Sequence, residues 1–136
     1  MEMIIYLFFN GTGESAMNFY ANALNGNIVS IQRYGEGSME CEDADKGKVM
    51  HGVLQTEQFT MMFSDTASKE PAVFGTNYSL SLNFHDEPSI DKVYTALSAG
   101  GNADMPLQDT FWGAKFGMCT DKFGVRWMFN YDRPKA

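Results

Sequence analysis

The sequence predicts an α+β fold made of two modules, each with the order strand, helix, strand, strand, strand. The first observation is an internal repeat: LFFNG at 7–11 resembles LNFHD at 82–86, which lies 75 positions later. The second is that a short amphipathic helix pattern follows each of these segments, at 14–24 and at 89–99. Because the same signals recur in the same order, we interpret the chain as a duplicated βαβββ unit.

The first module is expected at about residues 1–65. Its helix, 14–24, carries apolar side chains on one stripe and ends near Gly26, which suits a left-handed cap. The segment 35–48 is glycine-rich and acidic without an apolar period, so we expect it to be exposed and mobile. The predicted strands of this module lie near 3–10, 28–34, 48–56 and 59–65.

The second module is expected at about residues 77–136, after a linker at about 66–76. Its helix, 89–99, ends near Gly101, which is again suited to a left-handed cap. We expect the two modules to form a single domain over residues 1–136. The predicted strands of this module lie near 77–85, 102–109, 114–120 and 125–131.

Alternation along two strands predicts which side chains point away from the helices. In SLSLNF (79–84) the leucines and the phenylalanine should pack under the helix, and in IIYLFF (4–9) Leu7 and Phe9 match them. The opposite faces of the two sheets are expected to line a cup that holds a small molecule. The residues predicted to face this cup are Ile4, Tyr6, Phe8, Ser79, Ser81 and Asn83.

The phrase FWGAKFGMCTDKFGVRWMFN at 111–130 is the most distinctive in the chain. Together with IYLFFNGTGESAMNFY (5–20), VMHGVL (49–54) and MMFSD (61–65), it resembles the PhnB-like branch of the vicinal-oxygen-chelate superfamily, which contains glyoxalases, bleomycin-resistance proteins and extradiol dioxygenases. The resemblance covers nearly the whole chain. It implies curved mixed sheets around a cup, and homodimers whose cups lie at or near the interface.

The resemblance also implies where the superfamily's enzymes would hold a divalent metal. The corresponding positions are Ile4, Met62, Ser79 and Met128. None of these is a usual ligand, because proteins hold such ions with imidazole, carboxylate or thiolate groups. His51, His85 and the scattered carboxylates do not complete a set of three or four. We therefore predict no tightly held metal and no cofactor, with a divalent metal as the alternative.

Histidine and aromatic residues are the candidates for ligand binding. His51 lies inside the strand pattern KVMHGVLQ, so it is either a structural histidine bonded to a neighbouring strand or a hydrogen-bonding or acid–base group facing the cup. His85, at a strand end, is expected to be a solvated loop residue. Trp112 has no counterpart in the first module, which favours a pocket or a dimer interface. The predicted ligand-binding residues are Tyr6, Phe8, His51, Ser81, Asn83, Trp112 and Phe116, and no catalytic residue is assigned.

Lys115 and Arg126 are the basic residues near the aromatic phrase. Arg126 could bind a carboxylate or phosphate with both arms of its guanidinium group. The alternative is a solvated charge that faces the same side of the hairpin as Lys115. Six methionines are expected either to fill the core or to line a cup for an adaptable apolar ligand: Met39, Met50, Met61, Met62, Met118 and Met128.

Charge and the amino-terminal segment exclude several classes of partner. The net charge is −7, and an acidic surface repels phosphate backbones and anionic lipid, so we expect no nucleic-acid partner and no membrane partner. The start, MEMIIYLFF, has too short an apolar run for a signal peptide, which predicts a cytoplasmic protein.

Three functions are consistent with these patterns. The first is a protein that binds a small apolar or aromatic molecule in its cup without a tightly held metal. The second is a metal-dependent lyase, isomerase or dioxygenase of the glyoxalase kind with a site around His51. The third is a dimerising interaction module without catalysis.

Overall fold

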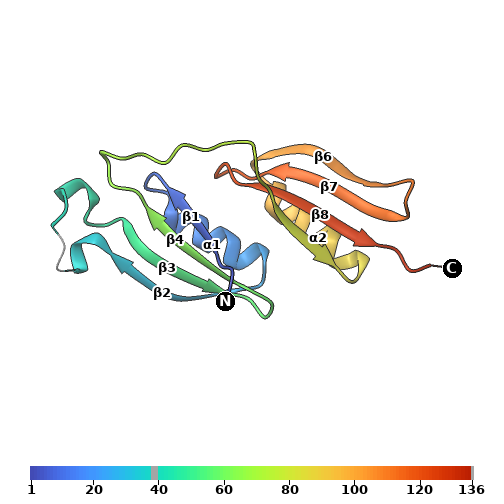
Figure 1. The fold of residues 1–136 in the computed structure, drawn as a ribbon, viewed down its shortest axis with the longest axis horizontal. Coiled ribbons are helices and arrows are strands. Elements are labelled where there is room, and N and C mark those ends of the chain that lie inside the picture. Colours follow the sequence, from blue (N-terminus) through green and yellow to red (C-terminus); the bar gives the residue numbers. More distant parts are fainter. Residues whose placement is uncertain (38–39, 136) are drawn as a thin grey trace. The chain divides into compact units, whose positions relative to one another are not determined.

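A computed structural model describes residues 1–37 and 40–135 of the chain (Figure 1). Met39, one of the methionines considered above, therefore lies outside the described residues. The chain divides into two compact units, Met1–Val73 and Phe74–Ala136. Each unit is a four-stranded mixed sheet with one helix packed on one face.

Unit 1, Met1–Val73, has the strand order β1-β4-β3-β2. Strand β1 runs parallel to β4, and the other neighbouring strands are antiparallel. A parallel pair needs a crossover connection, which here contains the helix. The elements are β1 (Ile5–Phe9), α1 (Gly13–Ala23), β2 (Asn27–Arg33), β3 (Val49–Gln55) and β4 (Thr60–Asp65).

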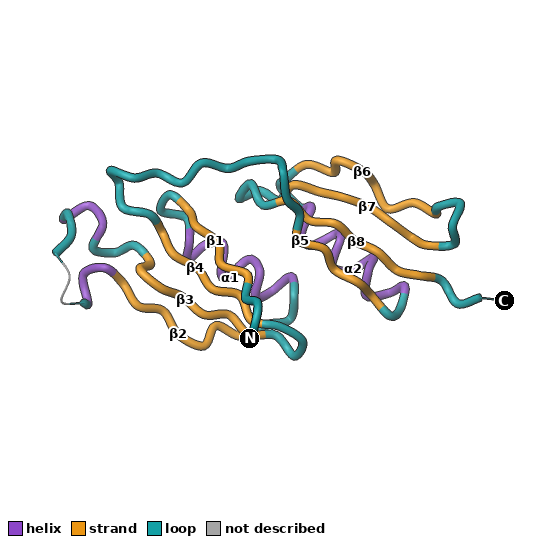
Figure 2. The backbone as a smooth tube through the Cα atoms, viewed as in Figure 1, coloured by secondary structure: helices purple, strands orange, loops and turns teal. Residues whose placement is uncertain are grey.

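Unit 2, Phe74–Ala136, repeats this arrangement with the strand order β5-β8-β7-β6 and a parallel pair of β5 and β8 (Figure 2). The predicted α+β class and the duplicated βαβββ topology are therefore confirmed, and both sheets are open. The elements are β5 (Leu80–Phe84), α2 (Glu87–Ser98), β6 (Asn102–Asp109), β7 (Ala114–Thr120) and β8 (Arg126–Asp132).

The strand register defines which positions of the two units correspond. In unit 1, Leu7 pairs with Phe63 across β1 and β4; in unit 2, Leu82 pairs with Phe129 across β5 and β8. The β3–β4 and β7–β8 pairs agree, because Gly52 lies opposite Phe63 as Gly117 lies opposite Phe129. It follows that Tyr6 corresponds to Ser81, and His51 to Phe116.

The core of each unit lies between the sheet and its helix. The helix side of each sheet is apolar and excludes water, which provides the main stabilisation of each unit. In unit 1 the fully buried side chains include Phe9, Met17, Tyr20, Leu54, Met61 and Phe63. In unit 2 they include Ile90, Leu97, Cys119, Val125, Trp127 and Phe129.

The left-handed residue after each helix is not the glycine that the sequence suggested. Asn25 has φ 54° and Gly100 has φ 74°, whereas Gly26 and Gly101 each lie one residue later. These two glycines are needed for close approach instead: a Cβ atom on Gly26 would lie 3.0 Å from Leu54 Cδ2, and one on Gly101 would collide with the carbonyl oxygen of Thr120. The prediction placed the caps one residue too late because two adjacent small or polar residues compete for that role.

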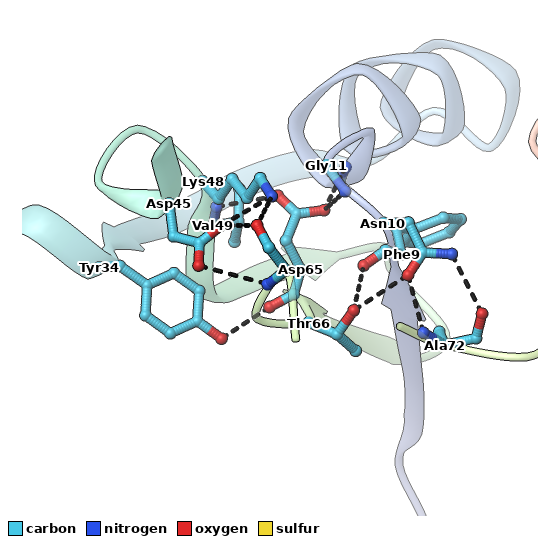
Figure 3. Close-up of polar contacts among 12 residues, drawn as sticks. Phe9, Asn10, Gly11, Tyr34, Asp45, Lys48, Val49, Asp65, Thr66 and Ala72 are labelled. Carbon is cyan, nitrogen blue, oxygen red and sulfur yellow. Dashed lines mark hydrogen bonds and ion pairs between the residues drawn. The ribbon is translucent and has the colours of Figure 1, made fainter. Parts of the chain in front are cut away.

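A buried aspartate joins three elements of unit 1 (Figure 3). Asp65, at the end of β4, accepts hydrogen bonds at Oδ1 from the backbone N–H groups of Gly11 (3.0 Å) and Gly13 (2.8 Å), and at Oδ2 from that of Val49 (2.9 Å). Tyr34 Oη donates to the Asp65 carbonyl oxygen at 2.7 Å. The carboxylate therefore caps α1 and offsets the cost of its own burial.

The sequence predicted that the acidic segment 35–48 is exposed, but part of it is buried. Ser38 and Met39 lie outside the described residues, but the side chain of Asp45 is 2 % exposed and accepts hydrogen bonds from Lys48 Nζ (2.8 Å) and Ser68 Oγ (2.6 Å). The hydrogen bond from Lys48 and, second, that from Ser68 lower the pKa of Asp45 to about 2. The prediction of exposure failed here because the carboxylate finds partners that the local sequence does not reveal.

The helices of both units are short. α1 has 11 residues and α2 has 12. Within residues 1–37 and 40–135, no helix has the length and apolar character needed to cross a membrane.

Candidate functional site

The face of the unit 1 sheet opposite α1, called here the unit 1 open face, carries two exposed aromatic rings. Tyr6 and Phe8 alternate along β1 with side chains on the helix side, and they are 39 % and 53 % exposed. Their ring centroids lie 5.0 Å apart with an interplanar angle of 28°. Stacked aromatic side chains with free edges and faces form a surface on which another flat apolar group can pack.

His51 lies on the same open face and contacts Tyr6. Tyr6 Oη and His51 Nδ1 are 2.9 Å apart, although β4 lies between the strands that carry them. Burial raises the pKa of Tyr6, and a hydrogen bond with Ser64 acts against this rise. Either group can donate in this hydrogen bond, depending on which ring nitrogen of His51 carries a proton. Both interpretations of His51 have support: the side chain bonds to another strand, and it does so on the open face.

The corresponding face of unit 2, the unit 2 open face, has a different chemistry. Ser81 on β5 lies opposite Met128 on β8, and Asn83 lies opposite Asn130. Asn130 Nδ2 donates to Asn83 Oδ1 at 2.8 Å, so these amides form a pair across the two strands. Phe116 on β7 lies opposite Asn130 and adds an aromatic ring to the same end of the sheet.

Trp112 lies in the turn before β7, next to Phe116. The two ring centroids are 6.5 Å apart at an angle of 62°, and Trp112 is 59 % exposed. Phe111, its neighbour, is 99 % exposed. Gly113 follows with φ 89°, which a side chain rarely adopts. The predicted residues thus form two clusters, one in each unit: Tyr6, Phe8 and His51, and Ser81, Asn83, Trp112 and Phe116.

The two basic residues near the aromatic phrase lie on opposite sides of the sheet. Lys115 Nζ bonds to Glu87 (3.0 Å) and Asp91 (2.6 Å) of α2, on the helix side. Arg126 pairs with Thr120 at the other end of the hairpin and alternates with the buried Trp127, which places Arg126 on the unit 2 open face. The alternative in which both charges share one side of the hairpin is therefore wrong. The pairing of β7 with β8 decides which face each side chain occupies, and it puts Lys115 and Arg126 on different faces.

The residues at the superfamily's metal positions do not fit a metal ion. Met62 and Met128 are in the strands β4 and β8, while Ile4 and Ser79 precede β1 and β5. These side chains offer thioether, alkyl and hydroxyl groups, which bind hard divalent ions poorly. In the part of the chain that the structure describes, no three side chains of His, Cys, Asp or Glu are grouped so that they could hold a metal ion. His85 is exposed just after β5, as expected of a loop histidine.

Besides Asp45, sequence reasoning missed two further buried carboxylates. Asp65 ends the run MMFSD, and Asp121 begins the turn DKFG. Asp121 accepts hydrogen bonds from the backbone N–H of Phe123 (2.8 Å) and from Trp127 Nε1 (2.8 Å). An aspartate directly after an apolar strand was the available signal, but it is equally typical of a solvated turn.

Comparison with known proteins agrees with this fold. Residues 1–129 match the family described as 3-demethylubiquinone-9 3-methyltransferase. The crystal structure of protein PA1353 from Pseudomonas aeruginosa is 36 % identical, with a TM-score of 0.90 over 98 % of this chain and 99 % of that one. A putative 3-demethylubiquinone-9 3-methyltransferase, PhnB protein, from Bacillus cereus is 30 % identical, with a TM-score of 0.81 over 96 % of this chain and 99 % of that one.

A more distant likeness concerns the fold alone. A glyoxalase/bleomycin resistance protein/dioxygenase family enzyme from Burkholderia phytofirmans is 14 % identical, with a TM-score of 0.63 over 96 % of this chain and 97 % of that one. The predicted PhnB-like resemblance is thereby confirmed, and the likeness to the Burkholderia enzyme agrees with the fold that this resemblance implied.

Proposed function

Because the chain belongs to the 3-demethylubiquinone-9 3-methyltransferase family, a PhnB-like branch of the vicinal-oxygen-chelate superfamily, we propose that it binds a small apolar or aromatic molecule in a cup, without a tightly held metal. The observation that carries this proposal is the cluster on the unit 1 open face. There, two stacked and exposed rings lie beside a phenol–imidazole hydrogen bond. Ligand sites commonly combine such apolar surface with a few polar groups that fix orientation.

The two predicted clusters, one in each unit, offer different groups to a ligand. Phe8 offers a ring face for stacking, and His51 offers Nε2 as a hydrogen-bonding group beside it. The amide pair of Asn83 and Asn130 offers further donors and acceptors on the unit 2 open face. Trp112 and Phe116 provide aromatic surface near that pair.

The family description names a methyltransferase, and the helix amino termini of this chain show whether an anionic cofactor group could be held there. Helix amino termini are common sites for the anionic groups of cofactors. Here the N–H groups of Gly11 and Gly13 at the start of α1 donate to Asp65. At the start of α2, the N–H of Ser89 donates to Asp86 at 2.8 Å. Both helix termini therefore use carboxylates of the chain itself.

A metal-dependent lyase, isomerase or dioxygenase is the alternative, and the Tyr6–His51 pair supports only the proton-transfer part of such chemistry. Histidine and tyrosine side chains can both act in proton transfer, and here their polar atoms lie 2.9 Å apart. The donor groups described above do not fit a metal ion, so this alternative would need proton transfer by Tyr6 and His51 themselves.

A homodimer is a further proposal, supported by exposed aromatic residues. Phe111 and Trp112 form an edge-to-face pair with centroids 5.0 Å apart, and both are exposed in the isolated chain. Aromatic residues are enriched in protein interfaces. Sedimentation velocity of the wild type and of Phe111→Ser/Trp112→Ser tests this, because a dimer built on this pair should dissociate in the variant. An unchanged dimer would remove the pair from the interface.

A thermal-shift screen of small aromatic compounds tests the binding proposal. A ligand at 100-fold its Kd should stabilise the chain by about 2.7 kcal/mol. The Phe8→Ala variant should lose most of this shift, while Val29→Ala, which removes an exposed apolar side chain from β2, should retain it. Metal analysis after dialysis is the second arm, and stoichiometric Zn, Ni, Fe or Mn would favour the enzyme instead.

A further inference from the structure

Arg126 differs from the other two arginines of the chain. Arg33 binds Glu14 at 2.9 Å, and Arg133 binds Glu87 at 2.8 Å. Within residues 1–37 and 40–135, no carboxylate oxygen lies within 4 Å of the Arg126 guanidinium group, and its buried Nε has no hydrogen-bond partner. A guanidinium group without an acceptor retains the capacity to bind an anion.

The position of Arg126 directs this charge onto the unit 2 open face. It is the first residue of β8, and Thr120 lies opposite on β7. The Thr120 hydroxyl donates to Asp104 Oδ2 at 2.7 Å, so that carboxylate has a partner other than Arg126. The charge of Arg126 also acts on Tyr78, where it opposes the rise in the tyrosine pKa that burial causes.

The rest of the unit 2 open face changes from apolar to polar along β8. Met128 follows Arg126 on the same face, and Asn130 follows Met128. Met118 lies opposite Met128, so thioether groups occupy the middle of the face. From Arg126 to Asn130 the strand advances about 13 Å, at about 3.3 Å per residue. A cation, an apolar stretch and an amide pair thus follow one another over the length of a small elongated molecule.

We infer that Arg126 anchors the carboxylate of an elongated ligand whose apolar body lies over Met128 and Met118 and whose far end reaches the Asn83–Asn130 amides. This inference rests on the proposed binding function and adds the chemical class of the ligand to it. The site is on the unit 2 open face and uses Arg126, which is outside the predicted set of ligand-binding residues.

Two observations favour a carboxylate over a doubly charged phosphate. A planar carboxylate matches the fork of a guanidinium group with two parallel hydrogen bonds. The chain has a net charge of −7, and the unit 2 open face offers a single arginine among the described residues. Such a site balances one negative charge, while a second charge would meet the repulsion of the acidic protein.

The test compares an acid with its neutral counterpart by isothermal titration calorimetry on the full chain. The probes are 4-phenylbutanoate and 4-phenylbutanamide, which share one apolar body. The variants are Arg126→Gln and a charge-matched control, Lys122→Gln, in the turn between β7 and β8, whose ammonium group lies over the Phe123 ring at 5.5 Å. We expect the wild type and Lys122→Gln to bind the acid at least about tenfold more tightly than the amide.

Arg126→Gln should lower the affinity for the acid by about 10- to 100-fold and remove the preference for acid over amide. Equal affinity of the wild type for both probes, or undiminished binding of the acid by Arg126→Gln, would overturn the role of Arg126 and leave the proposed function standing. If neither these probes nor the aromatic screen gives any binding, the proposed function fails as well. Circular dichroism of Arg126→Gln shows whether the variant is folded.

Discussion

The hydroxyl of Tyr6 lies 2.9 Å from Nδ1 of His51, although the strand β4 separates the two strands that carry them. The contact joins the edge strand β1 to β3 on the face opposite α1. This hydrogen bond fixes the orientation of the imidazole ring. Nε2 is then the ring nitrogen that a ligand on this face would contact.

Removal of this hydroxyl should weaken unit 1 slightly. Tyr6→Phe leaves Nδ1 of His51 without its protein partner, and we expect a loss of about 0.5–1.5 kcal/mol in the free energy of unfolding. Tyr78→Phe is the matched control, because Tyr78 has a similar exposure and its hydroxyl makes no hydrogen bond among the described residues. Urea unfolding of the three proteins gives the answer, and a Tyr6→Phe curve identical to the wild type would show that the contact adds nothing.

Asp65 should contribute far more, because its carboxylate is buried and accepts three backbone hydrogen bonds. Asp65→Asn replaces one accepting oxygen by an NH₂ group that faces backbone donors. We expect a loss of at least about 2 kcal/mol in the free energy of unfolding. Asp43→Asn serves as the control, since the Asp43 side chain is 95 % exposed and should change stability by no more than about 0.5 kcal/mol. Equal effects of the two substitutions would refute the capping role.

Gly101 should tolerate no side chain. A Cβ atom there would collide with the Thr120 carbonyl oxygen and the Asp121 backbone, neither of which can move without disturbing β7. Gly101→Ala should therefore cost about 1–3 kcal/mol. Gly47→Ala is the control, because nothing lies within 4 Å of its added methyl group. Thermal unfolding compares them, and a stable Gly101→Ala protein would contradict the close approach of the backbone.

Glu87 should make the stability of unit 2 depend on pH. Hydrogen bonds from Arg133 and, second, from Lys115 lower the pKa of Glu87 from 4.5 to about 2. Because the folded pKa lies below the unfolded value, the stabilisation is complete above pH 4.5 and disappears as the pH falls towards 2. Glu87→Gln should thus be less stable than the wild type at pH 6 and similar to it near pH 2.

The exposed Glu57 on the β3–β4 turn provides the control for that experiment. Glu57→Gln should follow the wild-type pH profile of unfolding. If Glu87→Gln also follows it, the ion pairs with Arg133 and Lys115 do not stabilise the unit.

The sequence was sufficient to predict the layout of both units. Alternating apolar residues decide which side of a strand faces the helix, and for this reason Tyr6 and Phe8 could be placed on the open face before any coordinates were known. The internal repeat also holds in the core, because Met61 pairs with Ile5 as Trp127 pairs with Leu80, and both Met61 and Trp127 are buried.

Long-range partners could not be predicted from local patterns. The burial of Asp45 depends on Ser68, which lies 23 residues later in the chain. The placement of Lys115 and Arg126 on opposite faces depends on the pairing of β7 with β8 around the turn at Gly124. A shift of one residue in that pairing would exchange the faces, and no pattern in the sequence fixes it alone.

Tyr6 corresponds to Ser81, and His51 corresponds to Phe116. The two units therefore share one backbone fold but carry different side chains on their open faces. The helix-side residues form the core of each unit, so residues of the open face can vary with smaller effects on folding. A graft should therefore succeed: Ser81→Tyr with Phe116→His would transplant the phenol–imidazole contact of the amino-terminal half onto the carboxy-terminal half. The side chains on the open face of each unit could then be redesigned separately.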